Sequence, residues 1–455
     1  MLRPLFSDLM VQQIIKRRKH NAYLKTEYSK IQRWSCQHMF RLESCARAPP
    51  IQKPQGMSEY DLARYEPYWQ KVANDFSIDP SFINLENGYY GIMPDPIFRE
   101  YQYQTRKLNL ENSYFLRTEY KENLEKIRIR LAKILGAKTN EIAITRGGTE
   151  ALQNLITGYN RLKSSDAILY SNLDYYSCRY AMEWLNKRHQ VDILELKIPE
   201  PANSQNILDT YEQAFQSNPH IKLVLLTHMN NRTGLVLPIK KIIELANHYE
   251  VEAIVDAAHS WGQIDFKVGD LDADYIGFSL HKWIHAPLGL GALFIRKSKL
   301  NHIDPFFADK LYPEDDVRSR VHSGTKNVAA FMTIDRALDY HLCLSAAAKE
   351  HRLRYLRDRW VEASSDLREL EILTPNDPSL NGGITSFRVA GCTSYAENKD
   401  IANYLKQAHN IFTVARKGPI NGACIRVTPA LFTLPEQVDR LSSALPQVIK
   451  KFKHT

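Results

Sequence analysis

From about residue 140 onward, short apolar runs alternate with amphipathic segments. The segment IKKIIELANHYE (239–250) has apolar residues at helical spacings of three and four, whereas the runs between such segments are short and nearly continuously apolar. The predicted strands are IAIT (142–145), AILYS (167–171), DILEL (192–196), KLVLLT (222–227), EAIVDA (252–257), DYIGFS (274–279) and GALFIR (291–296). Apolar strands that alternate with helices indicate an α/β fold, with a mostly parallel sheet covered by helices on both faces.

The order of the predicted elements changes after a long helical stretch at about 326–366. Strands and helices no longer alternate regularly there, which is typical of a smaller α+β domain. The elements are a strand in GITSFRV (383–389), a helix around 397–408, strands near 411–415 and 424–428, and a final helix over 435–452. We therefore expect a large domain over 81–329 and a small α+β domain formed by 56–80 and 330–455.

The N-terminal arm carries most of the net charge. The formal charge of the 455 residues is +9, and residues 1–50 contribute +7 of it, from ten Lys and Arg against three Asp and Glu. The rest of the chain is therefore nearly neutral, and the basic character is local. Pro49, Pro50 and Pro54 indicate a linker, so we expect a basic arm and linker over residues 1–55.

Composition excludes several classes of protein. The chain is 44% hydrophobic and 24% charged, which is typical of a soluble globular protein with a large core. No run approaches about 18 consecutive apolar residues, so we expect no membrane span. The six cysteines show no metal-like spacing, which favours free thiols, no metal and a cytoplasmic location. The arginine-rich arm leaves targeting to an organelle open.

Three sets of candidate functional residues follow predicted strands, where open α/β sheets bind their ligands. Gly148 and Thr149 open a helix after IAIT, and the N–H groups of such a helix start suit a phosphate, although a plain turn explains the pattern equally well. Asp256 follows EAIV, and a carboxylate at this position needs a cation, a hydrogen-bond donor or a following turn that it caps. Lys282 follows the next strand, and a desolvated lysine is a nucleophile for carbonyls.

Taken together, these groups match the needs of pyridoxal 5′-phosphate (PLP). This cofactor requires an anion site, a carboxylate that keeps its pyridine nitrogen protonated and an amine that forms a Schiff base. The stretch 83–445 resembles class V (fold type I) PLP-dependent enzymes, in the branch of isopenicillin-N epimerase-like proteins, selenocysteine lyases and cysteine desulfurases. The matching motifs are INLENGYYGIMP, ITRGGTEAL, HMNNRTGLVLPI, VDAAHSWGQ, FSLHKW, HSGT and IRVTPALFT.

The resemblance implies roles for the residues around the cofactor. Lys282 would form the Schiff base and, once released, act as the general base, and Asp256 would pair with the pyridinium nitrogen. The other cofactor-binding residues would be Gly148, Thr149, Ser279 and His281 at the phosphate, His259 at the 3-oxygen of the ring, Asn231 at the edge of the ring, and Tyr175, or its neighbour Tyr176, stacked on the ring.

The resemblance also implies contacts with a substrate and with a second subunit. Arg426 would bind the α-carboxylate of a small amino acid-type substrate, because a guanidinium binds a carboxylate bidentately and stays charged. Asn87 and Tyr89, near the start of the matching stretch, would touch the substrate as well. Gly324 and Thr325 match a loop that reaches the partner's phosphate, so we expect a homodimer with shared active sites.

The reaction implied by the resemblance takes place at the α-carbon, through a quinonoid intermediate. Related desulfurases need a cysteine in the loop before the Arg426 segment, and residues 412–423 contain none. Cys424 lies on a predicted strand, where we expect it to pack. We therefore predict an isopenicillin-N epimerase-like enzyme, with a C–S (β-elimination) lyase or an aminotransferase as alternatives.

A different class of function remains open for the basic arm. The PLP fold would then act as a ligand sensor, and residues 1–50 would bind a polyanion. However, these residues contain no glycine for the turn of a helix-turn-helix, so we do not expect nucleic-acid binding.

Overall fold

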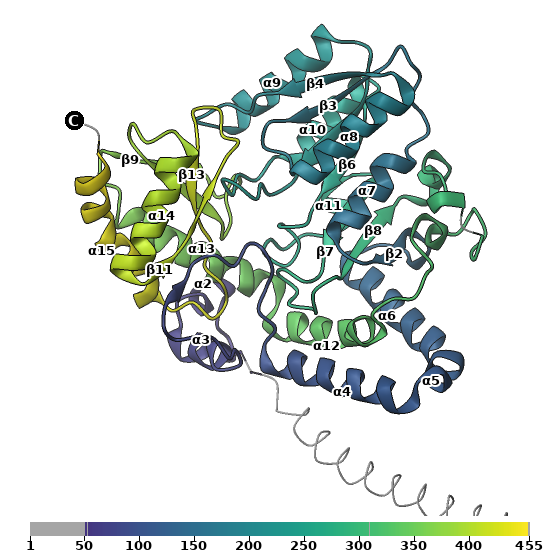
Figure 1. The fold of residues 1–455 in the computed structure, drawn as a ribbon, viewed down its shortest axis with the longest axis horizontal. Helices are drawn as coiled ribbons and strands as arrows, with labels where there is room; N and C mark the ends of the chain where they lie inside the picture. The colour runs from purple at the N-terminus through teal and green to yellow at the C-terminus, as the bar shows by residue number, and fades with distance from the viewer. Residues whose placement is uncertain (1–50, 52, 309, 454–455) are drawn as a thin grey trace, which may run out of the picture. The chain divides into compact units, whose positions relative to one another are not determined.

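The seven apolar runs form a single sheet in the computed structural model, which describes residues 51, 53–308 and 310–453 (Figure 1). The strand order is β2-β8-β7-β6-β5-β3-β4, and β8 is antiparallel to both of its neighbours while the other pairs are parallel. The strands are β2 (Ile142–Thr145), β3 (Ala167–Ser171), β4 (Asp192–Leu196), β5 (Ile221–Thr227), β6 (Glu252–Asp256), β7 (Tyr275–Ser279) and β8 (Gly291–Ile295). The predicted α/β class and all seven predicted strands are confirmed.

Helices cover both faces of this sheet, because successive strand residues point to opposite sides. Ile168 packs in the core beneath the first group of helices and Leu169 in the core beneath the second. The first group is α7 (Gly148–Gly158) and α8 (Tyr176–His189). The second group is α4 (Asp95–Glu111), α6 (Tyr120–Leu135), α9 (Ser204–Ser217), α10 (Ile239–His248) and α12 (Val328–Leu344). Short elements join them: α5 (Ser113–Thr118), α11 (Val268–Leu271) and the 3₁₀ turns η1 (Thr139–Glu141), η2 (Lys297–His302), η3 (Phe306–Ala308) and η4 (Val317–Arg320).

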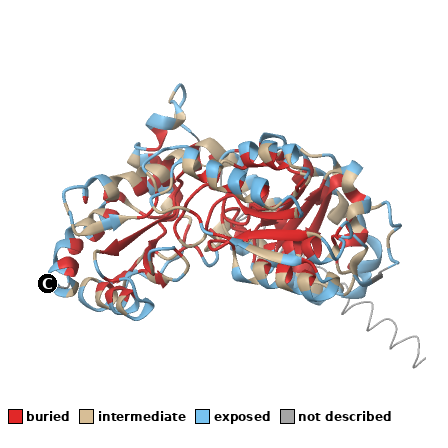
Figure 2. Cartoon of the chain, turned by 90° about the horizontal axis from the view of Figure 1, so that it is seen from above, coloured by how far each residue is buried: buried red, intermediate tan, exposed pale blue. Residues whose placement is uncertain are grey.

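The C-terminal part forms a second, antiparallel sheet with the strand order β12-β13-β10-β9. Its strands are β9 (Leu370–Ile372), β10 (Thr385–Val389), β12 (Val414–Arg416) and β13 (Cys424–Val427). Its helices are α13 (Ala346–Glu362), α14 (Tyr395–His409) and α15 (Pro435–Phe452). Figure 2 shows that the strands of both sheets are buried. The elements predicted for this α+β part are therefore present.

Two segments near the expected domain boundaries pack with the following parts of the chain. The stretch at about 326–366 contains two helices, α12 and α13, separated by Ser345 in a left-handed conformation (φ 60°). Helix α12 packs against α4 and α6 beside the large sheet, because its apolar residues belong to that core (Figure 1). Strand β1 (Ile83–Asn84) instead pairs with β11 (Ile411–Phe412) of the C-terminal part. Helix α12 therefore packs in the core of the large sheet, and β1 pairs within the C-terminal part.

Two N-terminal helices, α2 (Glu59–Leu62) and α3 (Glu66–Ala73), pack against the turn that carries Lys282. Trp69 shares a core cluster with Trp283 and with Leu353 of α13. The expected small-domain segment 56–80 therefore contacts both parts of the protein.

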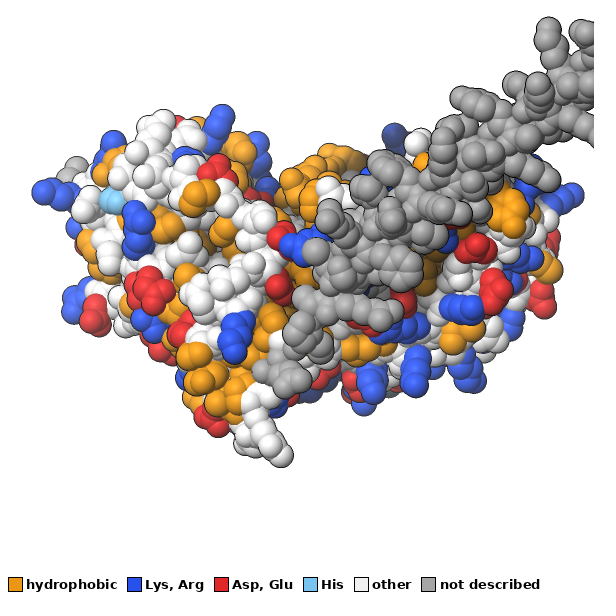
Figure 3. Space-filling model, turned by 90° about the horizontal axis from the view of Figure 1, so that it is seen from below, with side chains coloured by type: hydrophobic (Ala, Val, Ile, Leu, Met, Phe, Trp, Pro, Cys, Tyr) orange, Lys and Arg blue, Asp and Glu red, His pale blue; other side chains and the backbone are white. Residues whose placement is uncertain are grey.

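The surface outside the N-terminal arm carries charges of both signs. Basic and acidic side chains are interspersed over much of the face drawn in Figure 3, as expected for a nearly neutral stretch. Within the described part of the chain, no helix combines the length and apolarity needed to span a membrane. The predictions for residues 1–50, on charge-driven binding or targeting, lie outside the described residues.

Candidate active site

Lys282 lies in the turn after β7, three residues beyond Ser279, which ends the strand. Its Nζ is 2.8 Å from Nε2 of His259. Removal of the ammonium from water lowers the pKa of Lys282 to about 8, while Asp256 opposes this shift and Arg426 adds to it. A lysine with such a pKa supplies far more free amine, the nucleophilic form, near neutral pH than an exposed lysine does.

Asp256 and His259 come from the end of the adjacent strand β6. The Asp256 Oδ1 accepts a hydrogen bond of 2.8 Å from the N–H of Ala258, and burial raises the pKa of this carboxyl. Burial also lowers the pKa of His259 well below its ordinary value, so the ring is neutral. The Trp283 indole N–H donates to His259 Nδ1 across 3.5 Å, which orients the ring so that Nε2 faces Lys282.

The start of α7 lies beside the start of β8, where Gly291 is the first residue of the strand. Gly147 has a φ of 137°, which favours glycine, and Gly148 is the first helical residue. A Cβ on Gly291 would lie 2.3 Å from the carbonyl carbon of Gly147, so this close approach also requires glycine. Thr149 is exposed, and the first N–H groups of a helix have no acceptor within it.

Ser279 and His281 form a polar pair next to this helix start. Ser279 Oγ lies 3.3 Å from Nε2 of His281, and His281 Nδ1 is 2.9 Å from the carbonyl oxygen of Leu290. A Cβ on Gly147 would lie 3.8 Å from the His281 ring, so the pair borders the glycine turn. Burial lowers the pKa of His281 to about 4, so its ring contributes hydrogen bonds and no positive charge.

The candidates for stacking and for the ring edge are partly buried. Tyr175 is half-buried at the start of α8, and its ring centroid is 4.5 Å from that of Tyr176, which is 52% exposed. The lower exposure favours Tyr175 as the stacking residue. The Oδ1 atom of Asn231 is buried and has no hydrogen-bond partner among the described residues, so this side chain has an acceptor available for a ligand.

Arg426 is already bound to a carboxylate of the protein. Its Nε donates to Glu86 Oε2 at 3.2 Å, its Nη2 donates to Glu86 Oε1, and its Nη1 donates to the Asn231 carbonyl at 2.5 Å. Arg416 donates to the same Glu86 Oε1 at 3.1 Å. Sequence reasoning missed Glu86 and Arg416, although Arg416 lies in the stretch that was searched for a cysteine.

Other predicted site residues bond to the backbone or are exposed. The Asn87 amide donates to the backbone carbonyl of Thr428 at 2.9 Å, so it joins two segments of the chain. Tyr89 is 76% exposed, and Thr325, beside Gly324, is exposed too. Their predicted contacts with a substrate or a partner subunit remain predictions.

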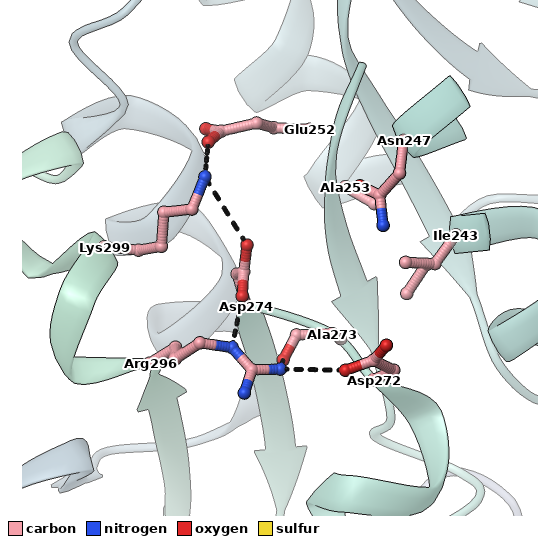
Figure 4. Close-up of a pocket in the computed structure, with 9 residues that line it drawn as sticks. All are labelled: Ile243, Asn247, Glu252, Ala253, Asp272, Ala273, Asp274, Arg296 and Lys299. Carbon is pink, nitrogen blue, oxygen red and sulfur yellow. Dashed lines mark hydrogen bonds and ion pairs between the residues drawn. The ribbon is translucent and has the colours of Figure 1, made fainter. Parts of the chain in front are cut away.

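A separate pocket lies at the opposite end of the parallel strands (Figure 4). Glu252, which begins β6, and Asp274 pair with Lys299, and Arg296 bonds to Asp274 and Asp272. Because these charges are paired with one another, the pocket has the character of an ion-pair network, and the chemistry remains at the Lys282 end of the sheet.

Comparison with known proteins identifies the family. The family model for class V aminotransferases matches residues 98–441, which is most of the chain. The chain belongs to the class V aminotransferase family. The match contains both strand ends described above, with Asp256 and Lys282, and it also contains Arg426.

Relatives of this class V enzyme cover most of its length. An isopenicillin N epimerase from Streptomyces clavuligerus is 27% identical over 83% of this chain and 97% of its own length. A cysteine desulfurase from Dictyoglomus turgidum is 25% identical over 74% of this chain and 86% of its own. The structure of a cysteine desulfurase from Thermococcus onnurineus NA1 has a TM-score of 0.72 at 20% identity, covering 84% of this chain and 98% of that one. This likeness shows the fold.

The cofactor of this class V enzyme is PLP, and the residues present fit it. Lys282 supplies an amine with a lowered pKa, and Asp256 supplies a buried carboxylate. The start of α7 supplies N–H groups for a phosphate, and Asn231 supplies a buried acceptor to which no donor of the described part of the chain bonds. These are the three kinds of group that PLP requires, together with a fourth for the edge of its ring.

Proposed function

We propose that this enzyme acts at the α-carbon of an amino acid and inverts its configuration, as the isopenicillin N epimerase relative is named for doing. The observation that carries the proposal is the position of Lys282, whose Nζ lies 2.8 Å from the neutral His259 ring and within electrostatic reach of Asp256. Elimination of a sulfur-containing side chain is the alternative, which the relatives named cysteine desulfurase favour.

Each residue near Lys282 has a defined task in this proposal. PLP, when bound, withdraws electrons from the α-carbon of a substrate amine. Lys282 binds the cofactor and then takes or returns the α-proton, for which a pKa of about 8 is well matched to neutral pH. Asp256 would hold the cationic ring nitrogen, which would compensate the cost of burying its carboxylate. His259 Nε2 orients the lysine amine or an oxygen on the ring.

The loop before the Arg426 segment has no thiol that could form a persulfide. Residues 412–423 contain no cysteine, and Cys424 is buried on β13. Burial raises the pKa of Cys424 to about 11, so the thiol stays protonated near neutral pH. Any cleavage of a C–S bond would therefore be an elimination that releases the sulfur directly.

The first experiment is the visible absorption spectrum of the purified protein with PLP. A yellow band that borohydride abolishes, with the reduced label on Lys282, supports the proposal. Lys282→Ala should lose the band, and Lys299→Ala, at the other end of the sheet, should keep it. Absence of the band in the wild type would refute the proposed function.

Epimerisation and elimination are then distinguished with a panel of amino acids in deuterated water. Epimerisation gives both enantiomers with deuterium at the α-carbon and releases no keto acid. Elimination from a β-substituted substrate releases pyruvate and the thiol. Formation of a keto acid together with conversion of PLP into its amine form would instead show an aminotransferase.

We also propose a homodimer with shared active sites. Phe307 is 91% exposed, and the ring of its neighbour Phe306 lies 5.7 Å from that of His322, so an exposed apolar side chain close to the segment of Gly324 and Thr325 supports an interface there. Light scattering should give twice the mass of the chain. Coexpression of Lys282→Ala with Gly324→Trp should restore part of the activity that each variant lacks alone, and its absence would argue against sharing.

A further inference from the structure

The segment 280–290, which carries Lys282, lies between β7 and β8 and is neither helix nor strand. Such a segment is positioned by hydrogen bonds from other parts of the chain. The Gly91 N–H provides one of them, at the carbonyl of the residue before Lys282 (2.9 Å). Lys349 provides another, because its Nζ donates to the carbonyl of Trp283 at 2.7 Å. The backbone on both sides of the reacting lysine is therefore held from outside the segment.

The Trp283 side chain continues this contact into the site. Its indole N–H donates to His259 Nδ1 across 3.5 Å, and His259 Nε2 lies 2.8 Å from the Nζ of Lys282. Trp283 thus receives a hydrogen bond from Lys349 at its carbonyl and donates one to His259 from its ring. Polar contacts run in an unbroken series from the start of α13 to the amine of Lys282.

Lys349 occupies a position where a lysine is unfavourable. It is 1% exposed, and it lies in the first turn of α13, where the helix dipole disfavours a cation. The Ser345 Oγ already caps this helix by accepting from the Ala348 N–H at 3.1 Å, so the helix start does not require the lysine. Its Nζ also lies 3.0 Å from His341 Nδ1 on α12. A side chain that costs stability where it stands is a candidate for a role in function.

We infer that Lys349 is a positioning residue for Lys282, which it holds through the backbone and the indole of Trp283. The indole in turn keeps the His259 ring against the reacting amine. The inference rests on the proposed function, in which Lys282 binds the cofactor and moves the α-proton. It connects helix α13 with the chemistry at the ends of β6 and β7, and Lys349 itself touches neither cofactor nor substrate.

The expected effect of removing Lys349 follows from the surroundings of Lys282. Burial is the main cause of the lowered pKa of Lys282, and a segment that is held less firmly gives this amine more water. Lys349→Met should therefore raise the pKa of the Lys282 nitrogen. The other titratable or charged groups around the two lysines, all of which this variant keeps, are Asp256, Cys178, His259, Arg416, Arg426, His341 and His285.

The visible band of the PLP-loaded protein reports the protonation of the Lys282 nitrogen, so the pH midpoint of this band is the measurement. Lys349→Met should raise the midpoint by about half a pH unit or more, the size expected for one lost hydrogen bond. Lys349→Gln keeps an N–H donor without the charge and should raise it less. Trp283→Phe, which removes the indole donor, should raise it as well.

Double variants test whether these residues act in series. Lys349→Met should add little to the pH midpoint once Trp283→Phe has broken the link, because coupled residues are not additive. His259→Ala, which removes the acceptor of the indole, provides a second background for the same comparison.

Arg352→Met is the matched control on the same helix. Arg352 is fully buried three residues further along α13, and it donates to the Ala63 carbonyl at 2.9 Å and to Glu66, which lie outside segment 280–290. Its loss should lower the midpoint of thermal unfolding and leave the pH midpoint of the band unchanged. A role that is structural only would give Lys349→Met this same pattern.

The outcomes are distinguishable. If Lys349→Met keeps the wild-type pH midpoint, or if Arg352→Met shifts it as much, the assignment is wrong. If Lys349→Met causes the same shift in the Trp283→Phe and His259→Ala backgrounds as in the wild type, Lys349 acts by its charge alone and the assignment is wrong too. If the wild type shows no visible band with PLP, the proposed function itself fails.

Discussion

Lys349 is a buried lysine behind the active site, and its effect on stability can be worked out from its surroundings. The residue is 1% exposed, and its Nζ donates to the Trp283 carbonyl at 2.7 Å and to Nδ1 of His341 at 3.0 Å. Burial lowers the pKa of Lys349 to about 7. His341 and His285 also face this cluster, and burial keeps both rings neutral by lowering their pKa values.

The burial of Lys349 makes stability depend on pH. The unfolded chain holds a proton on this amine up to a pKa of 10.5, whereas the folded chain releases it near 7, so stability rises with pH between these values. The penalty is about 4 kcal/mol at pH 7 and about 2 kcal/mol at pH 9. Lys349→Met removes this penalty, but it leaves the Trp283 carbonyl without its donor, at about 1–3 kcal/mol.

The two effects predict that Lys349→Met is at least as stable as the wild type at pH 7. By pH 9 the wild type should gain about 2 kcal/mol relative to the variant. Urea unfolding at both pH values, with the same cofactor content, measures this change. Lys126→Met, at a lysine whose side chain is 66% exposed, should show no such change. If the difference between wild type and Lys349→Met is the same at both pH values, Lys349 does not titrate as a buried amine.

Two further substitutions test the site. Cys424→Ala should leave turnover unchanged, because this thiol is buried and its pKa is raised. A large loss of turnover in steady-state assays would show that the thiol takes part in the reaction. Gly291→Ala should lower thermal stability by about 1–3 kcal/mol and weaken PLP retention, since its Cβ would lie 2.3 Å from Gly147. Gly269→Ala, where a Cβ meets nothing within 4 Å, is the control, and equal effects of both changes would contradict this reasoning.

The large sheet and the main catalytic candidates were predictable because they depend on local pattern. Buried parallel strands are continuous apolar runs, and such runs end at a visible change to polar residues. Asp256 and Lys282 follow two of these ends, and β6 and β7 are adjacent and parallel. Residues at the carboxyl ends of adjacent parallel strands meet in space, so the sequence places the carboxylate beside the lysine without further information.

The packing of α12 and β1 and the ion pair of Arg426 were not predictable in this way, because each depends on contacts between distant segments. Apolar periodicity identifies α12 as a helix but does not say which sheet it covers. Strand β1 has two residues, which is too short for a pattern, and it is defined by its pairing with β11. The Glu86–Arg426 pair likewise joins residues 340 positions apart. Charge alone could not show that this arginine already has a partner.

The charges of Arg416, Arg426 and Glu86 affect the protonation of Lys282. The ammonium of Lys282 loses water and lies near two guanidinium groups, and each of these conditions favours its neutral form. Glu86 offsets only one of the two guanidinium charges, so an excess positive charge remains near the amine. A bound carboxylate would neutralise that excess and would therefore favour the protonated lysine. The two arginines thus help to lower the pKa of Lys282 until an anionic substrate binds.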